Sequence, residues 1–134
     1  MEHIKWTGDR LILLDQRYLP YKEIYVECFS AEDVADAIFN MVVRGAPAIG
    51  VSAAYGMALA SLRGDNLAQA AKVLKDARPT AVNLAWAVDR VLEEAKSGKI
   101  ISVVAEQIFA EDISMNQAIG RVGAEIVPFR ASVL

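Results

Sequence analysis

The spacing of hydrophobic residues changes character near residue 30. Up to that point, short apolar runs are separated by polar stretches that contain Gly or Pro, and the runs are Trp6, Leu11–Leu14 and Ile24–Cys28. Short runs bounded by turn residues are typical of β-strands, and the pair Gly8-Asp9 indicates a hairpin turn between the first two. We therefore expect residues 1–29 to form a small antiparallel sheet.

From residue 30 onward, the apolar residues recur at helical spacing. The first helix is expected to begin after Ser30, whose hydroxyl can accept the backbone N–H of Asp33, and to run to about Val42. Four more helices are expected at about 47–62, at about 67–77, from Thr80 as N-cap to about Lys96, and over most of 101–127, with Pro128 ending the last one.

This order of elements predicts an α+β fold, in which a small N-terminal antiparallel sheet is followed by a bundle of about five helices. A chain of 134 residues is long enough for a single domain with a substantial core. Within it we assign residues 1–29 to the sheet, 30–128 to the helical bundle and 129–134 to an extended link. The helix at 47–62 is expected to pack closely, because many of its residues are small: Ala48, Ala53, Ala54 and Gly56.

Composition narrows the functional classes. Hydrophobic residues make up 54% of the chain, which is rich for an isolated domain and suggests that a partner or further chain covers part of its surface. No apolar run reaches the roughly 18 residues of a membrane span, and the first residues lack the apolar region of a secretory signal. The net charge of −3, with both signs interspersed, argues against a nucleic-acid partner. The single cysteine fits a reducing cytoplasm.

The sequence lacks the usual catalytic and metal-binding constellations. His3 is the only histidine and Cys28 the only thiol, which excludes an ordinary zinc site, and we interpret Cys28 as a small buried apolar residue. Neither of the common glycine-rich phosphate motifs occurs. Five carboxylates have no evident partner and are interpreted as helix caps or solvated side chains: Asp15, Asp33, Asp36, Asp89 and Asp112.

The most informative segment is a predicted tight loop of Arg44, Gly45 and Ala46, after which Pro47 is expected to begin a helix. The free N–H groups of a helix start attract anions, and Arg44 adds a planar fork of donors. Arg78 lies at a second helix entrance. Together these groups can hold a phosphate, but they cannot transfer a proton, because Arg stays protonated near neutral pH. The alternative interpretation is an ordinary turn between helices with a solvated Arg.

At this point the residues carry a resemblance that spans almost the whole chain. The chain resembles the S-methyl-5-thioribose-1-phosphate isomerase family, which shares its fold with ribose-1,5-bisphosphate isomerase and with regulatory subunits of the translation-initiation exchange factor. The motifs occur in the family's order: Ile4-Lys5-Trp6, Leu13–Pro20, Val43–Gly50, Ala53–Gly56 and Arg78–Leu84.

The resemblance implies an activity and a site. It implies aldose–ketose isomerisation of 5-methylthioribose 1-phosphate to 5-methylthioribulose 1-phosphate in methionine salvage, without a metal or an organic cofactor. It also implies that the sugar phosphate is contacted by Arg44, Gly45, Ala46 and Arg78. The family's catalytic Cys and Asp belong to a following Rossmann-like domain, which implies that they lie beyond Leu134 and that this chain is the N-terminal domain alone.

Two alternatives stay open at this stage. One is ribose-1,5-bisphosphate isomerase, and the other is a non-catalytic regulatory or interaction domain like those of the exchange-factor subunits. The intact Arg44–Ala46 loop favours an enzyme. The resemblance further implies a cytoplasmic homodimer in the full-length form, in which this domain packs on the C-terminal one. Gln117 and Val122 stand where the family more often has Arg and His.

Overall fold

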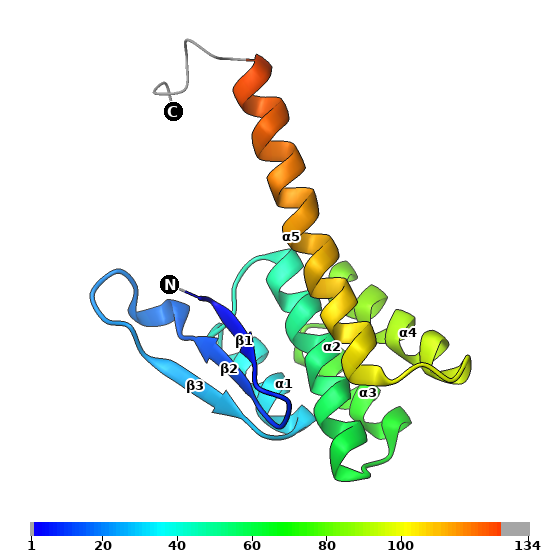
Figure 1. Ribbon diagram of the computed structural model, residues 1–134. Coiled ribbons are helices and arrows are strands. Elements are labelled where there is room, and N and C mark those ends of the chain that lie inside the picture. The colour runs from blue at the N-terminus through cyan, green and yellow to red at the C-terminus, as the bar shows by residue number, and fades with distance from the viewer. Residues whose placement is uncertain (1, 127–134) are drawn as a thin grey trace.

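The computed structural model describes residues 2–126, with side chains described for residues 2–113. It contains a three-stranded antiparallel sheet followed by five α-helices (Figure 1), which confirms the expected α+β fold. The expected extended link at 129–134 lies outside the described residues. The elements in chain order are β1 (Ile4–Trp6), β2 (Leu11–Leu14), a 3-10 turn (Gln16–Tyr18), β3 (Tyr25–Cys28), α1 (Ala31–Phe39), α2 (Ala46–Arg63), α3 (Leu67–Ala77), α4 (Val82–Lys96) and α5 (Ile101–Ile126).

The sheet is a meander in the order β1-β2-β3. The Gly8-Asp9 hairpin predicted from the sequence joins its first two strands, and Gly8 has a φ of +100°, a region that favours glycine. Because side chains alternate between the two faces of a strand, the fully buried Leu11, Leu13 and Cys28 share the face that packs on the helices.

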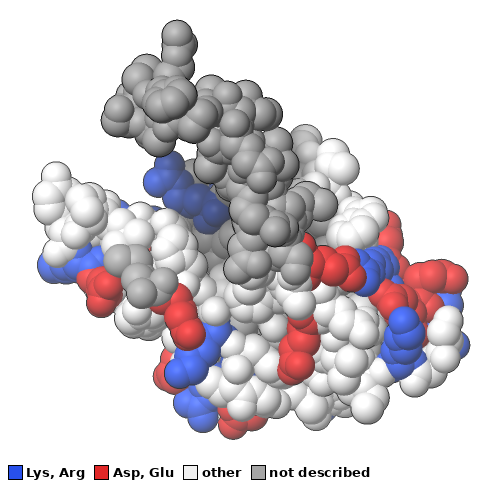
Figure 2. Space-filling view, turned by 45° about the horizontal axis from the view of Figure 1, so that its top comes forward, with Lys and Arg blue, Asp and Glu red and all other residues white. Residues whose placement is uncertain are grey.

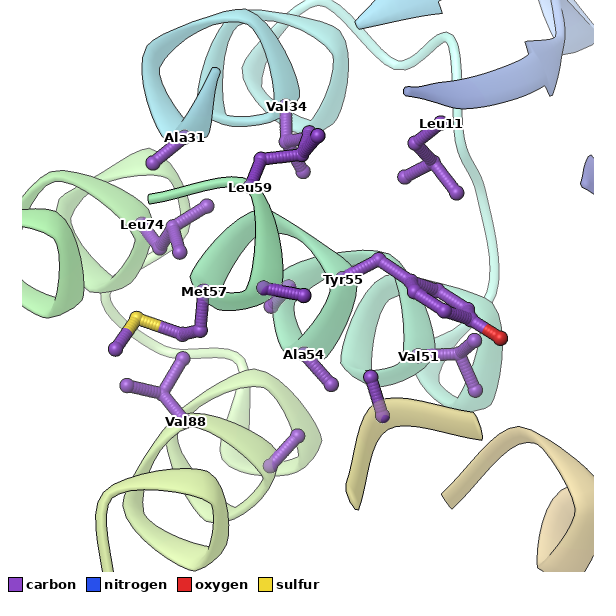
Figure 3. Close-up of a cluster of buried hydrophobic side chains, with 14 of the residues drawn as sticks. Leu11, Ala31, Val34, Val51, Ala54, Tyr55, Met57, Leu59, Leu74 and Val88 are labelled. Carbon is purple, nitrogen blue, oxygen red and sulfur yellow. The ribbon is translucent and has the colours of Figure 1, made fainter. Parts of the chain in front are cut away.

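Helix α2 is the central element of the domain. It packs against all four other helices and against β1 and β2, so that every residue from Ile49 to Ala60 is buried. A helix that is hydrophobic all round is stable only inside a core. Figure 3 shows this arrangement, with Val34 of α1, Leu74 of α3 and Val88 of α4 arranged around the buried side chains of α2.

The small residues of α2 allow this close packing, as expected from the sequence. Ala53 and Ala54 are fully buried. A Cβ atom added to Gly56 would lie 3.0 Å from Leu74 Cδ2, and one added to Gly50 would lie 3.0 Å from the backbone oxygen of Asn83. The neighbouring helices therefore approach α2 more closely than a larger side chain at these positions would permit.

Several helix ends differ from the expectations. Helix α1 stops at Phe39 rather than near Val42, because Asn40 caps it and Met41 has a φ of +65°. Helix α2 begins at Ala46, one residue before Pro47, with Gly45 as its N-cap, so the predicted loop is shorter by one residue. Thr80 is not the N-cap of α4; that position is occupied by Ala81, whose side chain cannot accept a hydrogen bond.

Helix α5 runs alongside α2 and α4 and then continues beyond them (Figure 1). Its first part is anchored by the buried residues Ile101, Val104, Ala105 and Ile108. The expectation that Gly120 and Gly123 permit close approach falls on side chains that the structure does not describe, and Pro128 lies outside the described residues. Within residues 2–126, the helices are too short or too polar to cross a membrane.

Candidate functional site

The segment before α2 is anchored to the 3-10 turn that follows β2, and it exposes its arginine. Val42 and Val43 are buried, and the Val42 carbonyl accepts a hydrogen bond of 3.0 Å from the backbone N–H of Gln16. Arg44 and Gly45 follow and are exposed. Gly45 has a φ of +92°, and an added Cβ there would meet no atom within 4 Å. Backbone conformation rather than space therefore requires glycine at this position.

The segment before α4 has a similar construction. Arg78 ends α3 and is half-buried, and its carbonyl accepts a 3.0 Å hydrogen bond from the N–H of Ala81. Helix α4 then begins at Val82. Among the side chains of residues 2–113, neither guanidinium, of Arg44 or of Arg78, pairs with a carboxylate.

The N-termini of α2 and α4 are distinguished by what they lack. Ser30 caps α1 by accepting the Asp33 N–H at 3.1 Å, and Asn66 caps α3 by accepting the Gln69 N–H at 2.9 Å. By contrast, neither α2 nor α4 has a side-chain cap. Within the described part of the chain, their first N–H groups have no hydrogen-bond partner: Ala46 and Ala48 in α2, and Val82, Asn83 and Leu84 in α4.

These two N-termini lie at the same end of the bundle. Gly50, near the start of α2, meets Asn83 at the start of α4, and farther along Met57 of α2 lies beside Val88 of α4 (Figure 3). The two helices therefore run side by side in the same direction. The fold thus places the first turns of α2 and α4, which follow Arg44 and Arg78 in the sequence, at the same end of the bundle.

A groove of about 420 Å³ opens at this end between α2, α4 and α5. Its lining is mainly apolar: Pro47, Gly50, Val51, Val82, Asn83, Trp86, Ala87 and Ile108, with Glu111 and Asp112 contributed by α5. Trp86 and Val82 were not predicted as site residues. Their separation of four positions on one helix face was the available signal, but it is also typical of an ordinary buried stripe.

An ion-pair network joins the α4 and α5 walls of the groove. Arg90 donates two hydrogen bonds to Glu111, from Nη1 to Oε1 at 2.6 Å and from Nη2 to Oε2 at 2.8 Å, and a third to Glu94 Oε2 at 2.7 Å. Its guanidinium carbon also lies over the Trp86 ring, 5.5 Å from the ring centroid, which is a cation–π contact. The Arg90 guanidinium lowers the pKa of Glu111, which keeps this carboxylate ionised near neutral pH.

The remaining reactive groups lie away from this end or are blocked. Cys28 is fully buried in the sheet, as the sequence suggested, and burial raises the pKa of its thiol to about 12. Asp15 caps the 3-10 turn, one of the two roles expected for it, but it is buried and paired with Arg17. Asp89 is also paired, with Lys75. Within residues 2–113, no three His, Cys, Asp or Glu side chains gather in a way that could hold a metal ion.

Comparison with known proteins identifies the family of this chain. Residues 42–134 match the model of the initiation factor 2 subunit family. The methylthioribose-1-phosphate isomerase of Alcanivorax borkumensis is 46% identical over 142 residues, which cover 97% of this chain and 41% of that protein.

Two solved structures are similar in fold. The 5-methylthioribose 1-phosphate isomerase from Pyrococcus horikoshii superposes with a TM-score of 0.83 at 32% identity, over 92% of this chain and 40% of that one. The delta subunit of translation initiation factor eIF-2B from A. fulgidus gives 0.82 at 38% identity, over 94% and 42%. The chain thus spans about two fifths of these proteins, and it belongs to the initiation factor 2 subunit family.

Proposed function

We propose that this chain is the substrate-binding N-terminal domain of a methylthioribose-1-phosphate isomerase. In this proposal the phosphate of 5-methylthioribose 1-phosphate binds between the Arg44-Gly45-Ala46 segment and Arg78. The observation that carries the proposal is the pair of uncapped helix N-termini, each preceded by an arginine, at one end of the bundle. The isomerase names of relatives such as that from Alcanivorax borkumensis support the choice of substrate.

The charges at this end suit a phosphate monoester. A helix N-terminus is equivalent to roughly half a positive charge, so α2 and α4 together supply about one. Arg44 and Arg78 add one full charge each. A phosphate monoester near neutral pH carries between one and two negative charges. Two arginines can also each present paired N–H donors to two phosphate oxygens, which a lysine cannot do.

In the proposed reaction, the sugar ring opens and a hydrogen is transferred between C1 and C2, which converts the aldose to the ketose. Both steps need groups that can accept and donate protons. The guanidinium groups of Arg44 and Arg78 cannot do so near neutral pH. We therefore assign binding and orientation of the 1-phosphate to this chain, and we place the acid and base of the reaction in residues outside it.

Two related functions are weighed against this proposal. The observation for a non-catalytic domain is the similarity to the eIF-2B delta subunit of A. fulgidus, whose TM-score of 0.82 nearly equals the 0.83 of the isomerase. Ribose-1,5-bisphosphate isomerase would use the same anion-binding end. We favour methylthioribose 1-phosphate because relatives such as the protein from Alcanivorax borkumensis, 46% identical over 142 residues, are named as its isomerase. We also propose that the full-length protein is a cytoplasmic homodimer, in which this domain packs on a C-terminal domain.

Calorimetric titration of the chain with 5-methylthioribose 1-phosphate tests the phosphate site. Arg44→Lys should weaken binding although the charge is kept, and Arg78→Ala should weaken it by about ten- to a hundredfold, since a charged hydrogen bond contributes roughly 1.5–3 kcal/mol. Arg63→Ala is the matched control, because Arg63 is an exposed arginine at the opposite end of α2. Equal affinities for all four proteins would disprove the site.

A further inference from the structure

Three aromatic rings from different elements meet on the side of the domain where β1 and α5 both contact α2. Trp6 of β1 stacks on Tyr55 of α2, with the ring centroids 5.0 Å apart and an angle of 20° between the ring planes. Phe109 of α5 meets Tyr55 edge to face, at a centroid distance of 6.1 Å. Because such contacts between aromatic rings are favourable, they hold the three rings in a fixed arrangement.

These rings line an open cavity of about 350 Å³ that is separate from the proposed phosphate-binding end. It has no lining residue in common with the groove between α2, α4 and α5. Tyr55 also lies about two and a half helical turns beyond Ala46, the first residue of α2. A ligand in this cavity therefore does not require a phosphate at the helix N-termini. The other residues that line it are Glu2, Ile4, Lys5 and Glu106.

The charged residues of the cavity give it a net negative charge. Glu2 and Glu106 contribute two carboxylates, and Lys5 contributes one ammonium group. Among the side chains of residues 2–113, neither of these carboxylates pairs with a cation. Burial, together with the charge of Glu106, raises the pKa of Tyr55 to about 12, so this ring is an uncharged phenol near neutral pH.

Aromatic rings bordered by carboxylates favour one type of ligand. The faces of aromatic rings carry partial negative charge and attract cations, and Trp attracts them most strongly. An unmodified ammonium group is strongly hydrated, which reduces what it gains at such a surface. A methylated ammonium group instead presents its charge behind apolar methyl groups, and clusters of aromatic rings are the surfaces that recognise it in proteins.

We propose that the cavity beside the Trp6–Tyr55–Phe109 stack binds a small compound that carries a trimethylammonium group. The methyl groups contact the aromatic rings, and the nearby carboxylates of Glu2 and Glu106 balance the positive charge. Tyr55 is only 2% exposed, whereas Trp6 and Phe109 are half-buried, so these two rings supply most of the contact surface. The ligand thus contacts both β1 and α5.

NMR titration of the 134-residue chain with choline and with 3,3-dimethylbutan-1-ol tests this site. The two compounds have nearly the same shape, but a carbon replaces the charged nitrogen in the second. We expect choline to bind at least about fivefold more tightly, because only the cation is attracted by the ring faces. Trp6 and Trp86 are the two tryptophans of the chain. Choline should shift the indole N–H signal of Trp6 and leave that of Trp86, in the other groove, unchanged.

Two variants locate the binding energy while Trp6 is kept as the reporter. Glu106 is exposed, so Glu106→Gln preserves the core and should weaken choline binding about threefold by removing an opposite charge. Phe109→Leu should reduce the preference for choline over the neutral compound about twofold, because one ring is lost. Glu93→Gln is the matched control for the charge, since Glu93 is an exposed carboxylate of α4 outside the cavity.

The site is overturned if choline does not bind, or if it binds no more tightly than the neutral compound. It is also overturned if the Trp86 signal shifts instead of the Trp6 signal, or if Glu106→Gln and Glu93→Gln have equal effects. A peptide that contains trimethyl-lysine is titrated as well, since the same group occurs on protein side chains. Tighter binding of this peptide than of choline would overturn the assignment to a small compound.

None of these outcomes depends on the phosphate site, which the arginine variants test separately.

Discussion

At the scale of single residues, Asp15 shows how a buried charge is accommodated in the sheet. Its side chain is 1% exposed, and it accepts hydrogen bonds from the backbone N–H of Arg17 at 3.0 Å and from the Arg17 guanidinium at 2.9 and 2.7 Å. The turn that this pair holds also contains Gln16, whose N–H donates to Val42 just before Arg44. Asp15 therefore supports the base of the candidate phosphate loop.

We predict that Asp15→Asn destabilises the domain by about 1 kcal/mol at pH 7, because the amide loses the charged hydrogen bonds of the carboxylate. The hydrogen bonds from Arg17 lower the pKa of Asp15 in the folded state. Its contribution is therefore fully present above the unfolded pKa of about 3.9 and is lost as the pH falls through the lower folded-state value. Urea unfolding at pH 7 and at pH 3 should show the difference between parent and variant shrinking.

Asp9→Asn serves as the comparison for this prediction. Asp9 also pairs with a neighbouring arginine, Arg10, but its side chain is 71% exposed. Exposed ion pairs contribute little to stability. A loss of stability in Asp15→Asn no larger than that in Asp9→Asn, or a difference independent of pH, would contradict the role assigned to the buried carboxylate.

At the scale of elements, α2 is constrained by contact on all sides. Ala53 is fully buried in the middle of the helix, with other elements packed around it. Ala53→Leu should therefore overpack the core and cost about 1–3 kcal/mol in unfolding free energy. Thermal and urea unfolding measure this cost, and Ala68→Leu on the exposed face of α3 is the control. If both variants unfold like the parent, the assigned packing of α2 is wrong.

The spacing of hydrophobic residues was sufficient to predict the three strands before residue 30 and the five helices after it. Each strand buries a short apolar run, and each helix buries an apolar face. The ends were harder to predict. Helix α1 ends early because Met41 has a positive φ, and helix α4 has Ala81 instead of Thr80 at its N-cap position. Neither feature can be predicted from local sequence preference. Trp86 could not be assigned to a groove, since its exposure depends on where α5 passes α4.

At the scale of the whole molecule, the domain combines a closely packed core with an end at which two helix N-termini lie side by side. Helices α2 and α4 direct their N-termini to this end, and α5 extends past it (Figure 1). The surface in Figure 2 carries acidic and basic side chains in alternation, without the extended basic face that a nucleic acid would need.

The distribution of reactive groups leads to a prediction about the chain as a catalyst. Isomerisation needs a proton acceptor and a proton donor near C1 and C2, within hydrogen-bonding distance of the bound sugar. Among the side chains of residues 2–113, the groove at the proposed phosphate-binding end is mainly apolar, and its carboxylates are Glu111 and Asp112. Glu111 is held by Arg90, and the buried thiol of Cys28 has a pKa of about 12.

We therefore expect the 134-residue chain to bind 5-methylthioribose 1-phosphate without converting it. The measurement is a product assay for 5-methylthioribulose 1-phosphate with the purified chain, at ligand concentrations that calorimetry shows to be saturating. The isomerase of Alcanivorax borkumensis, which is 46% identical over the shared region, is the positive control. Binding without turnover agrees with a domain that orients the phosphate for groups supplied elsewhere. Turnover that Arg78→Ala abolishes would instead place the acid and base within these residues, and Asp112 at the edge of the groove would be the first carboxylate to substitute.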